Sequence, residues 1–128
     1  MEVNTPPICA YQNLRVYQYA TTLAEDTFWI TRTFPGKEQQ ALTDQLRRTA
    51  QTIPRNVLQG WNRRYCGCAF RNHLDEAQSA CARLGLWFDL ARDRGYLTKN
   101  EHQKLTSQKN RIQRMLTRLH NYRIALLA

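Results

Sequence analysis

The stretch FRNHLDEAQSACARLGLWFDLA, residues 70–91, decides the fold class of this chain. Its apolar residues return at alternating steps of four and three, which places them on one face of an α-helix. This pattern predicts a long amphipathic helix over Tyr65 to Arg94, closed by Gly95, because glycine readily adopts the left-handed conformation that often ends a helix. The predicted inward face consists of Phe70, Leu74, Ala77, Cys81, Leu84, Phe88 and Ala91.

The sequence on either side of this stretch predicts three further helices by the same periodicity. The first spans Tyr11 to Arg32 and ends at the turn signal Phe34-Pro35-Gly36. The second spans Lys37 to Gln59, and we expect Pro54 inside it to kink the helix without ending it. The fourth begins at Thr98-Lys99-Asn100-Glu101, a capping box in which the first and last side chains accept hydrogen bonds from each other's backbone amides.

Each of these helices has an apolar face that we expect to point into a shared core. In the fourth helix, leucine or isoleucine recurs every seven residues. The expected inward residues of the first helix are Val16, Ala20, Leu23, Thr27 and Ile30, with Tyr17, Ala24 and Phe28 widening that face. Those of the second and fourth helices are Leu42, Leu46, Thr49, Ile53, Val57, Leu105, Ile112, Leu119 and Leu126.

Four amphipathic helices joined by short connections favour an all-α fold. No segment has the alternating pattern of a β-strand, and the short connections make neighbouring helices antiparallel. We therefore predict an up-down-up-down four-helix bundle over residues 11–128. Residues 1–10 are predicted to be a flexible tail, because Pro6 and Pro7 prevent a helix there.

The composition excludes several classes of protein. A length of 128 residues is one domain's worth, and an apolar content of 42% is typical of a globular chain. No apolar run is longer than five residues, so no transmembrane helix is expected, and the N-terminal residues lack the pattern of a secretory signal. We expect a cytoplasmic protein whose four cysteines are thiols rather than a disulfide framework.

The net charge of +9 is concentrated in two segments of the chain. Residues 96–128 carry seven basic residues and one acidic residue, and residues 35–64 carry six and two. In the later segment, basic residues spaced by seven form a stripe beside the apolar face, and in the earlier segment a pair of arginines lies between Trp61 and Tyr65. A cationic surface with interleaved aromatic rings suits phosphate contacts and base stacking. The candidate nucleic-acid-binding residues are Lys104, Arg111, Arg114, Arg118, Arg63 and Arg64.

Two other interpretations of the basic residues are open at the level of sequence. The charge can form a solvated face that only keeps the protein in solution. It can also meet acidic residues of a neighbouring subunit, for which Glu25, Asp26, Asp75 and Glu76 are available.

No catalytic or metal-binding pattern stands out. Cys66 and Cys68 are separated by a single residue, whereas zinc sites usually place two or more residues between paired cysteines, and the nearest histidine is His73. Asp89 and Asp93 lie one turn apart with arginines beside them, which indicates charge balancing at the surface. We therefore expect neither an enzyme nor a bound metal or cofactor.

Three pieces of the sequence resemble a known bacterial family. They are Phe34-Pro35, the segment Leu42 to Arg48, and the run Ile53-Pro54-Arg55-Asn56-Val57-Leu58-Gln59-Gly60 with the basic pair Arg63-Arg64 after it. The family is that of small four-helix-bundle proteins encoded in 23S ribosomal RNA intervening sequences, and it includes the accessory variability determinants of diversity-generating retroelements. The resemblance covers about residues 11–120. Gln59 and Arg83 stand where the family often has acidic residues.

The resemblance implies a homo-oligomer of four-helix bundles, in the form of a pentamer. For the retroelement members it implies nucleic-acid binding and association with a reverse transcriptase during mutagenic copying of a template RNA, whereas the intervening-sequence members have no established activity. Our leading hypothesis is therefore a basic accessory protein that holds RNA or DNA for a reverse transcriptase. The alternative is a structural or protein-interaction oligomer of the intervening-sequence type.

We expect the matched residues to act through structure rather than through direct ligand contacts. Asn56 is expected to form a hydrogen bond across the bundle or a subunit contact, and Gly60 to permit a tight exit from the second helix.

Overall fold

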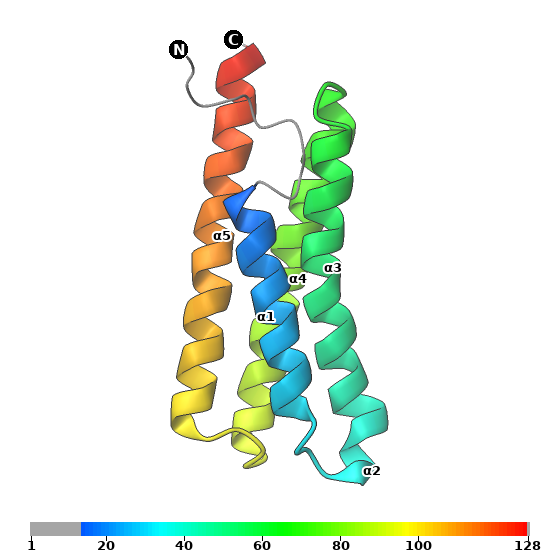
Figure 1. The fold of residues 1–128 in the computed structure, drawn as a ribbon, viewed down its shortest axis with the longest axis vertical. Helices are drawn as coiled ribbons and strands as arrows, with labels where there is room; N and C mark the ends of the chain where they lie inside the picture. Colours follow the sequence, from blue (N-terminus) through cyan, green and yellow to red (C-terminus); the bar gives the residue numbers. More distant parts are fainter. Residues whose placement is uncertain (1–13, 128) are drawn as a thin grey trace.

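The chain forms four long helices in the computed structural model, which describes residues 14–127 apart from the side chains of 38–40 and 123–127 (Figure 1). Successive long helices run in opposite directions, and a short helix and a π-helix connect the first long helix to the second. No strand occurs among the described residues. In chain order the elements are α1 (Arg15–Thr31), α2 (Gly36–Glu38), η2 (Gln39–Thr43), α3 (Asp44–Asn62), α4 (Gly67–Asp93) and α5 (Lys99–Leu127).

The four long helices form a closed ring in cross-section. α1 packs against α3 and α5, and α4 packs against the same two helices. α1 and α4 therefore occupy one pair of opposite corners, and α3 and α5 occupy the other. This arrangement is an up-down-up-down four-helix bundle, as the periodicity predicts. None of the helices in the described residues combines the length and the apolar character that a membrane span requires.

The core follows the predicted inward faces most closely in α3 and α4. All seven predicted residues of α4 are buried, and Phe70 and Phe88 are among the largest fully buried side chains. In α5 the buried residues are Leu105, Ile112 and Leu116, while Leu119 is partly buried and the side chain of Leu126 lies outside the described residues.

The buried face of α1 is narrower than the sequence predicts. Thr31 is buried, Ile30 is only partly buried, and Phe28 exposes 42% of its surface. Phe28 lines an open groove between α1 and α3, together with Trp29, and does not face the core. The prediction that Phe28 widens the inward face is therefore wrong.

The helix predicted over Lys37 to Gln59 is formed as a continuous helical run, which comprises α2, η2 and α3 and extends from Gly36 to Asn62. Within this run residues 39–43 form the π-helix η2, which the sequence does not predict, and Leu42 and Thr43 of this turn are both buried. α3 then continues through Pro54 and ends at Asn62, so Gly60 lies within the helix rather than at its exit.

The turn between α4 and α5 confirms two predictions. Gly95 has a φ of 80°, which is the left-handed conformation that glycine tolerates best. The capping box is formed: the Thr98 amide donates to Glu101 Oε1 at 2.9 Å, and the Glu101 amide donates to Thr98 Oγ1 at 3.1 Å. The predicted tail, residues 1–10, and the predicted first residues of the first helix, 11–13, lie outside the described residues.

Candidate nucleic-acid interface

The predicted basic stripe lies along α5, on the side that faces α1. Lys104 is nearest to an acidic group, because its Nζ is 3.9 Å from Asp26 Oδ2 on α1. The same carboxylate oxygen accepts a hydrogen bond of 2.9 Å from Gln108 Nε2. Lys104 is 64% exposed, so this ion pair is solvent-screened, but it places a compensating negative charge beside that end of the stripe.

Arg111, at the middle of the stripe, lies against an aromatic ring of α1. Its guanidinium carbon is 4.4 Å from the ring centre of Tyr19, and the Tyr19 hydroxyl accepts a hydrogen bond of 3.3 Å from Arg15. The hydrogen bond from Arg15, followed by the positive charge of Arg111, holds the pKa of the Tyr19 phenol below its usual value. Two guanidinium groups thus lie beside this exposed phenol.

The C-terminal half of the stripe is uncompensated. Arg111, Arg114 and Arg118 are all exposed, and none of them forms an ion pair with an acidic side chain of the described residues. Arg111 and Arg118 also line a cleft of about 410 Å³ between α5 and the start of α1, together with Arg15. Three guanidinium groups from two helices thus border one depression in the surface.

The other two predicted residues, Arg63 and Arg64, lie at the end of α3. The Arg64 guanidinium carbon lies between the rings of Trp61 and Tyr65, at 4.6 Å and 4.7 Å from their centres, and its NH1 donates to the Trp61 carbonyl at 2.9 Å. Arg64, which follows α3, therefore caps the C-terminal end of that helix, and Arg63 beside it is exposed.

The structure does not bring these two groups of arginines together within one chain. Arg63 and Arg64 belong to the end of α3, the stripe belongs to α5, and these helices are at opposite corners of the bundle. The residues that do join the stripe are Arg15 and Tyr19 of α1, which sequence reasoning missed. Their spacing of four residues on one helix is a local signal of contact, but it does not show which other helix they face.

The run that carries the family resemblance packs against α4. His73 Nδ1 donates a hydrogen bond of 2.9 Å to Asn56 Oδ1, and Asn56 Nδ2 donates to the Thr52 carbonyl at 3.0 Å. One turn further, a Cβ placed on Gly60 would lie 3.0 Å from the Cβ of His73. Asn56 thus forms the predicted hydrogen bond across the bundle, and Gly60 permits α3 and α4 to approach each other.

Comparison with protein families gives one match that covers most of the chain. The sequence model of the family described as 23S rRNA-intervening sequence protein matches residues 12–118. The chain belongs to this family. Comparison with curated proteins gives no match.

A solved structure supports the fold of this family member. It is a protein of unknown function from the S23 ribosomal protein family of Bacteroides thetaiotaomicron VPI-5482, to which the chain is similar with a TM-score of 0.74 and 15% sequence identity. The alignment covers 83% of this chain and 95% of that protein. At this identity the likeness concerns the fold alone. The family match supports the intervening-sequence side of the predicted resemblance and adds nothing to the retroelement side.

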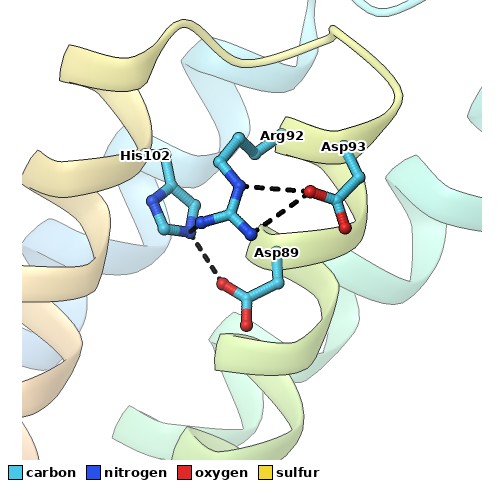
Figure 2. Close-up of polar contacts among 4 residues, drawn as sticks. All are labelled: Asp89, Arg92, Asp93 and His102. Atoms are coloured by element: carbon cyan, nitrogen blue, oxygen red, sulfur yellow. Dashed lines mark hydrogen bonds and ion pairs between the residues drawn. The ribbon is translucent and has the colours of Figure 1, made fainter.

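The intervening-sequence family member has a second polar cluster, at the opposite end of α5 (Figure 2). His102 Nε2 lies 2.7 Å from Asp89 Oδ1 and donates to it, because an ionised carboxylate can only accept. Arg92 donates from Nε and NH2 to Asp93 Oδ1, both at 3.2 Å. The charge balancing predicted here is thus formed by Arg92 and Asp93, while Asp89 pairs with a histidine that the sequence did not indicate. The cluster ties the end of α4 to the start of α5.

The cysteines of this family member occupy two kinds of environment. Cys66 and Cys68 are exposed at the start of α4. Cys81 is buried in the core, and burial raises the pKa of its thiol to about 12, so it stays protonated at neutral pH. Within the described residues, no three side chains of histidine, cysteine, aspartate or glutamate are grouped so that they would hold a metal ion.

Proposed function

We propose that this protein binds nucleic acid, without catalysing a reaction, through the α1–α5 face. This face comprises Arg15 on α1 and Lys104, Arg111, Arg114 and Arg118 on α5. One observation carries the proposal: three consecutive arginines of α5 are exposed and uncompensated within two helical turns, and Arg15 of α1 joins them. Clustered guanidinium groups attract phosphates by Coulomb forces and bind them through hydrogen bonds.

Family membership does not choose between RNA and DNA as the bound nucleic acid, because the family is described by the 23S rRNA intervening sequences that encode its members. It favours the intervening-sequence setting over a retroelement accessory role. Association with a reverse transcriptase stays a prediction, which the neighbouring genes test directly. A reverse transcriptase with template and variable repeats beside the gene would support that role, and an rRNA operon would contradict it.

The binding experiment measures the affinity for a labelled RNA–DNA duplex over a series of salt concentrations. The logarithm of the affinity should fall linearly with the logarithm of the salt concentration, by roughly 0.9 for each phosphate neutralised on a B-form duplex. Replacing Arg111, Arg114 and Arg118 together by Glu should abolish most of this binding and flatten the slope.

A matched variant controls for net charge in this experiment. Lys37, Arg71 and Lys99 are exposed and lie outside the α1–α5 face, so their replacement by Glu changes the net charge equally. This variant should retain most of the affinity, apart from a long-range effect that salt screens. Equal loss in both variants, or an affinity that does not depend on salt, would contradict the proposed interface.

A second candidate function, homo-oligomerisation, has its own supporting observation. Between α1 and α3 lies a groove of about 600 Å³, whose lining combines apolar side chains such as Phe28 and Trp29 with polar and charged ones such as Glu25 and Arg55. Trp29 is 60% exposed there, and its ring meets that of Phe28 edge to face at a centre distance of 5.6 Å. We propose that a second copy of the chain covers this groove, in keeping with the homo-oligomer that the family resemblance implies.

A further inference from the structure

The cleft between α1 and α5 differs from the rest of the basic face because it combines charge with an apolar floor. Its volume of about 410 Å³ falls in the range of small-ligand sites, roughly 300–1,000 Å³. Its lining consists of Leu14, which directly precedes α1, of Arg15 and Val16 from α1, and of Arg111, Met115, Arg118 and Leu119 from α5. No acidic side chain belongs to this described lining.

The arginines of the cleft are held without being neutralised. Tyr19 contacts two of them, because its hydroxyl accepts from Arg15 at 3.3 Å and its ring lies 4.4 Å from the Arg111 guanidinium carbon. A cation–π contact fixes a guanidinium while leaving its edge N–H groups free to donate. Arg15 and Arg111 are therefore oriented by an uncharged ring rather than by a carboxylate that a phosphate would have to displace.

The apolar side chains at the floor of the cleft offer a contact surface that a bound phosphate group would not use. Leu14 and Val16 are buried, whereas Met115 and Leu119 are only partly buried, so the apolar surface of the cleft comes mainly from α5. A duplex presents mainly its phosphates and sugars to such a cleft, because its bases are paired and stacked. A single strand can turn one unstacked base onto the apolar floor while its phosphate meets the arginines.

We propose that this cleft binds one nucleotide of a single-stranded RNA segment, with the phosphate held by Arg15, Arg111 and Arg118 and the base against Met115 and Leu119. The inference depends on the nucleic-acid binding proposed above and adds to it a preference for unpaired strands. A methionine suits such a floor because its flexible, polarisable side chain adapts to bases of different shape.

The test compares two labelled probes, a short oligouridylate and an RNA duplex of equal length, on the full chain. Arg15→Gln should lower the affinity for the single strand by about tenfold, the effect of one lost charged hydrogen bond. The affinity for the duplex should fall by a clearly smaller factor, because a duplex meets Arg15 only as one charge of the α1–α5 face. Met115→Gln should also lower the affinity for the single strand more than the affinity for the duplex, because it makes the floor of the cleft polar without changing a charge.

Arg114→Gln is the matched control, because Arg114 belongs to the α1–α5 face but does not line the cleft. It should lower the affinity for both probes by similar factors. If Arg15→Gln and Met115→Gln lower the affinity for the two probes by equal factors, or lower neither affinity, the cleft is not a single-strand site. The proposed nucleic-acid binding would still stand in that case. If the unaltered protein binds neither probe in a salt-dependent way, the proposed function itself fails. Arg15 is exposed, so thermal unfolding should show Arg15→Gln to be folded.

Discussion

Two residues of the run around Pro54 that carries the family resemblance, Asn56 and Gly60, pack against a single side chain, His73. Asn56 and Gly60 are four residues apart and therefore share one face of α3. The first accepts the hydrogen bond of the imidazole and the second leaves space for its Cβ. This face brings α3 and α4 into close contact, so the motif identifies the family without identifying a ligand site.

Replacing Gly60 by Ala should destabilise the fold by about 1–2 kcal/mol, in the range of overpacking penalties. Alanine normally improves a helix interior by about 0.5–1 kcal/mol over glycine, but here its methyl group would lie 3.0 Å from the Cβ of His73. Chemical denaturation measures the difference. Gly67→Ala is the control, because nothing lies within 4 Å of the added Cβ, and it should be neutral or stabilising. A stabilised Gly60→Ala variant would mean that α3 and α4 are not in close contact there.

At the level of helices, boundaries with a side-chain signal can be predicted and those without one cannot. The capping box at Thr98 and the glycine at position 95 use specific side-chain or backbone chemistry, and both are formed as predicted. The π-helix η2 has no comparable signal, because its segment Gln39–Thr43 contains neither a capping pattern nor a Gly or Pro that would mark a change of helix type. The buried face of α1 is narrower than predicted for a related reason: apolar residues bordering a groove and those facing a core look alike in a sequence.

Thr98→Ala should cost about 1 kcal/mol of stability, because the amide of Glu101 loses its acceptor at the start of α5. Thr98→Ser keeps an oxygen at the same position and should retain most of that stability. Denaturant midpoints of the two variants, measured with unchanged slopes, give the comparison. Equal destabilisation by alanine and serine would contradict a role for the hydroxyl in capping.

At the scale of the molecule, the ring order of the helices decides which charges meet. In an up-down-up-down bundle, helices consecutive in the chain are neighbours, so α3 and α5 must be at opposite corners. The stripe on α5 is predictable from its spacing of seven, and its separation from Arg63 and Arg64 is predictable from the order of the helices. That Arg15 and Tyr19 join the stripe is not predictable, because a single sequence does not show which surface residues of the first and last helices face each other.

Trp29→Glu should convert an oligomer of this protein into a species with the mass of one chain, 15.1 kDa, if the groove between α1 and α3 is the contact between copies. A carboxylate at this position would lose its hydration when a second copy covers the groove, which is costly even with Arg32 nearby, whose guanidinium carbon is 4.9 Å from the ring centre of Trp29. Light scattering after size-exclusion chromatography measures the mass. Leu86→Glu, at a leucine of α4 that is 69% exposed, should leave the mass unchanged. An unaltered protein that is already monomeric would overturn the second candidate function.

The contact between α1 and α5 joins the beginning of the described chain to its end, as the bond between Asp26 and Gln108 across 82 residues illustrates. Bringing such distant segments together costs more loop-closure entropy than forming the α3–α4 or α4–α5 hairpins. We therefore expect this pair to dock late in folding and to separate early in unfolding. A nucleic-acid strand bound in the cleft would contact both α1 and α5 and so hold the first and last helices together. Binding of the strand should therefore lengthen the lifetime of the folded protein.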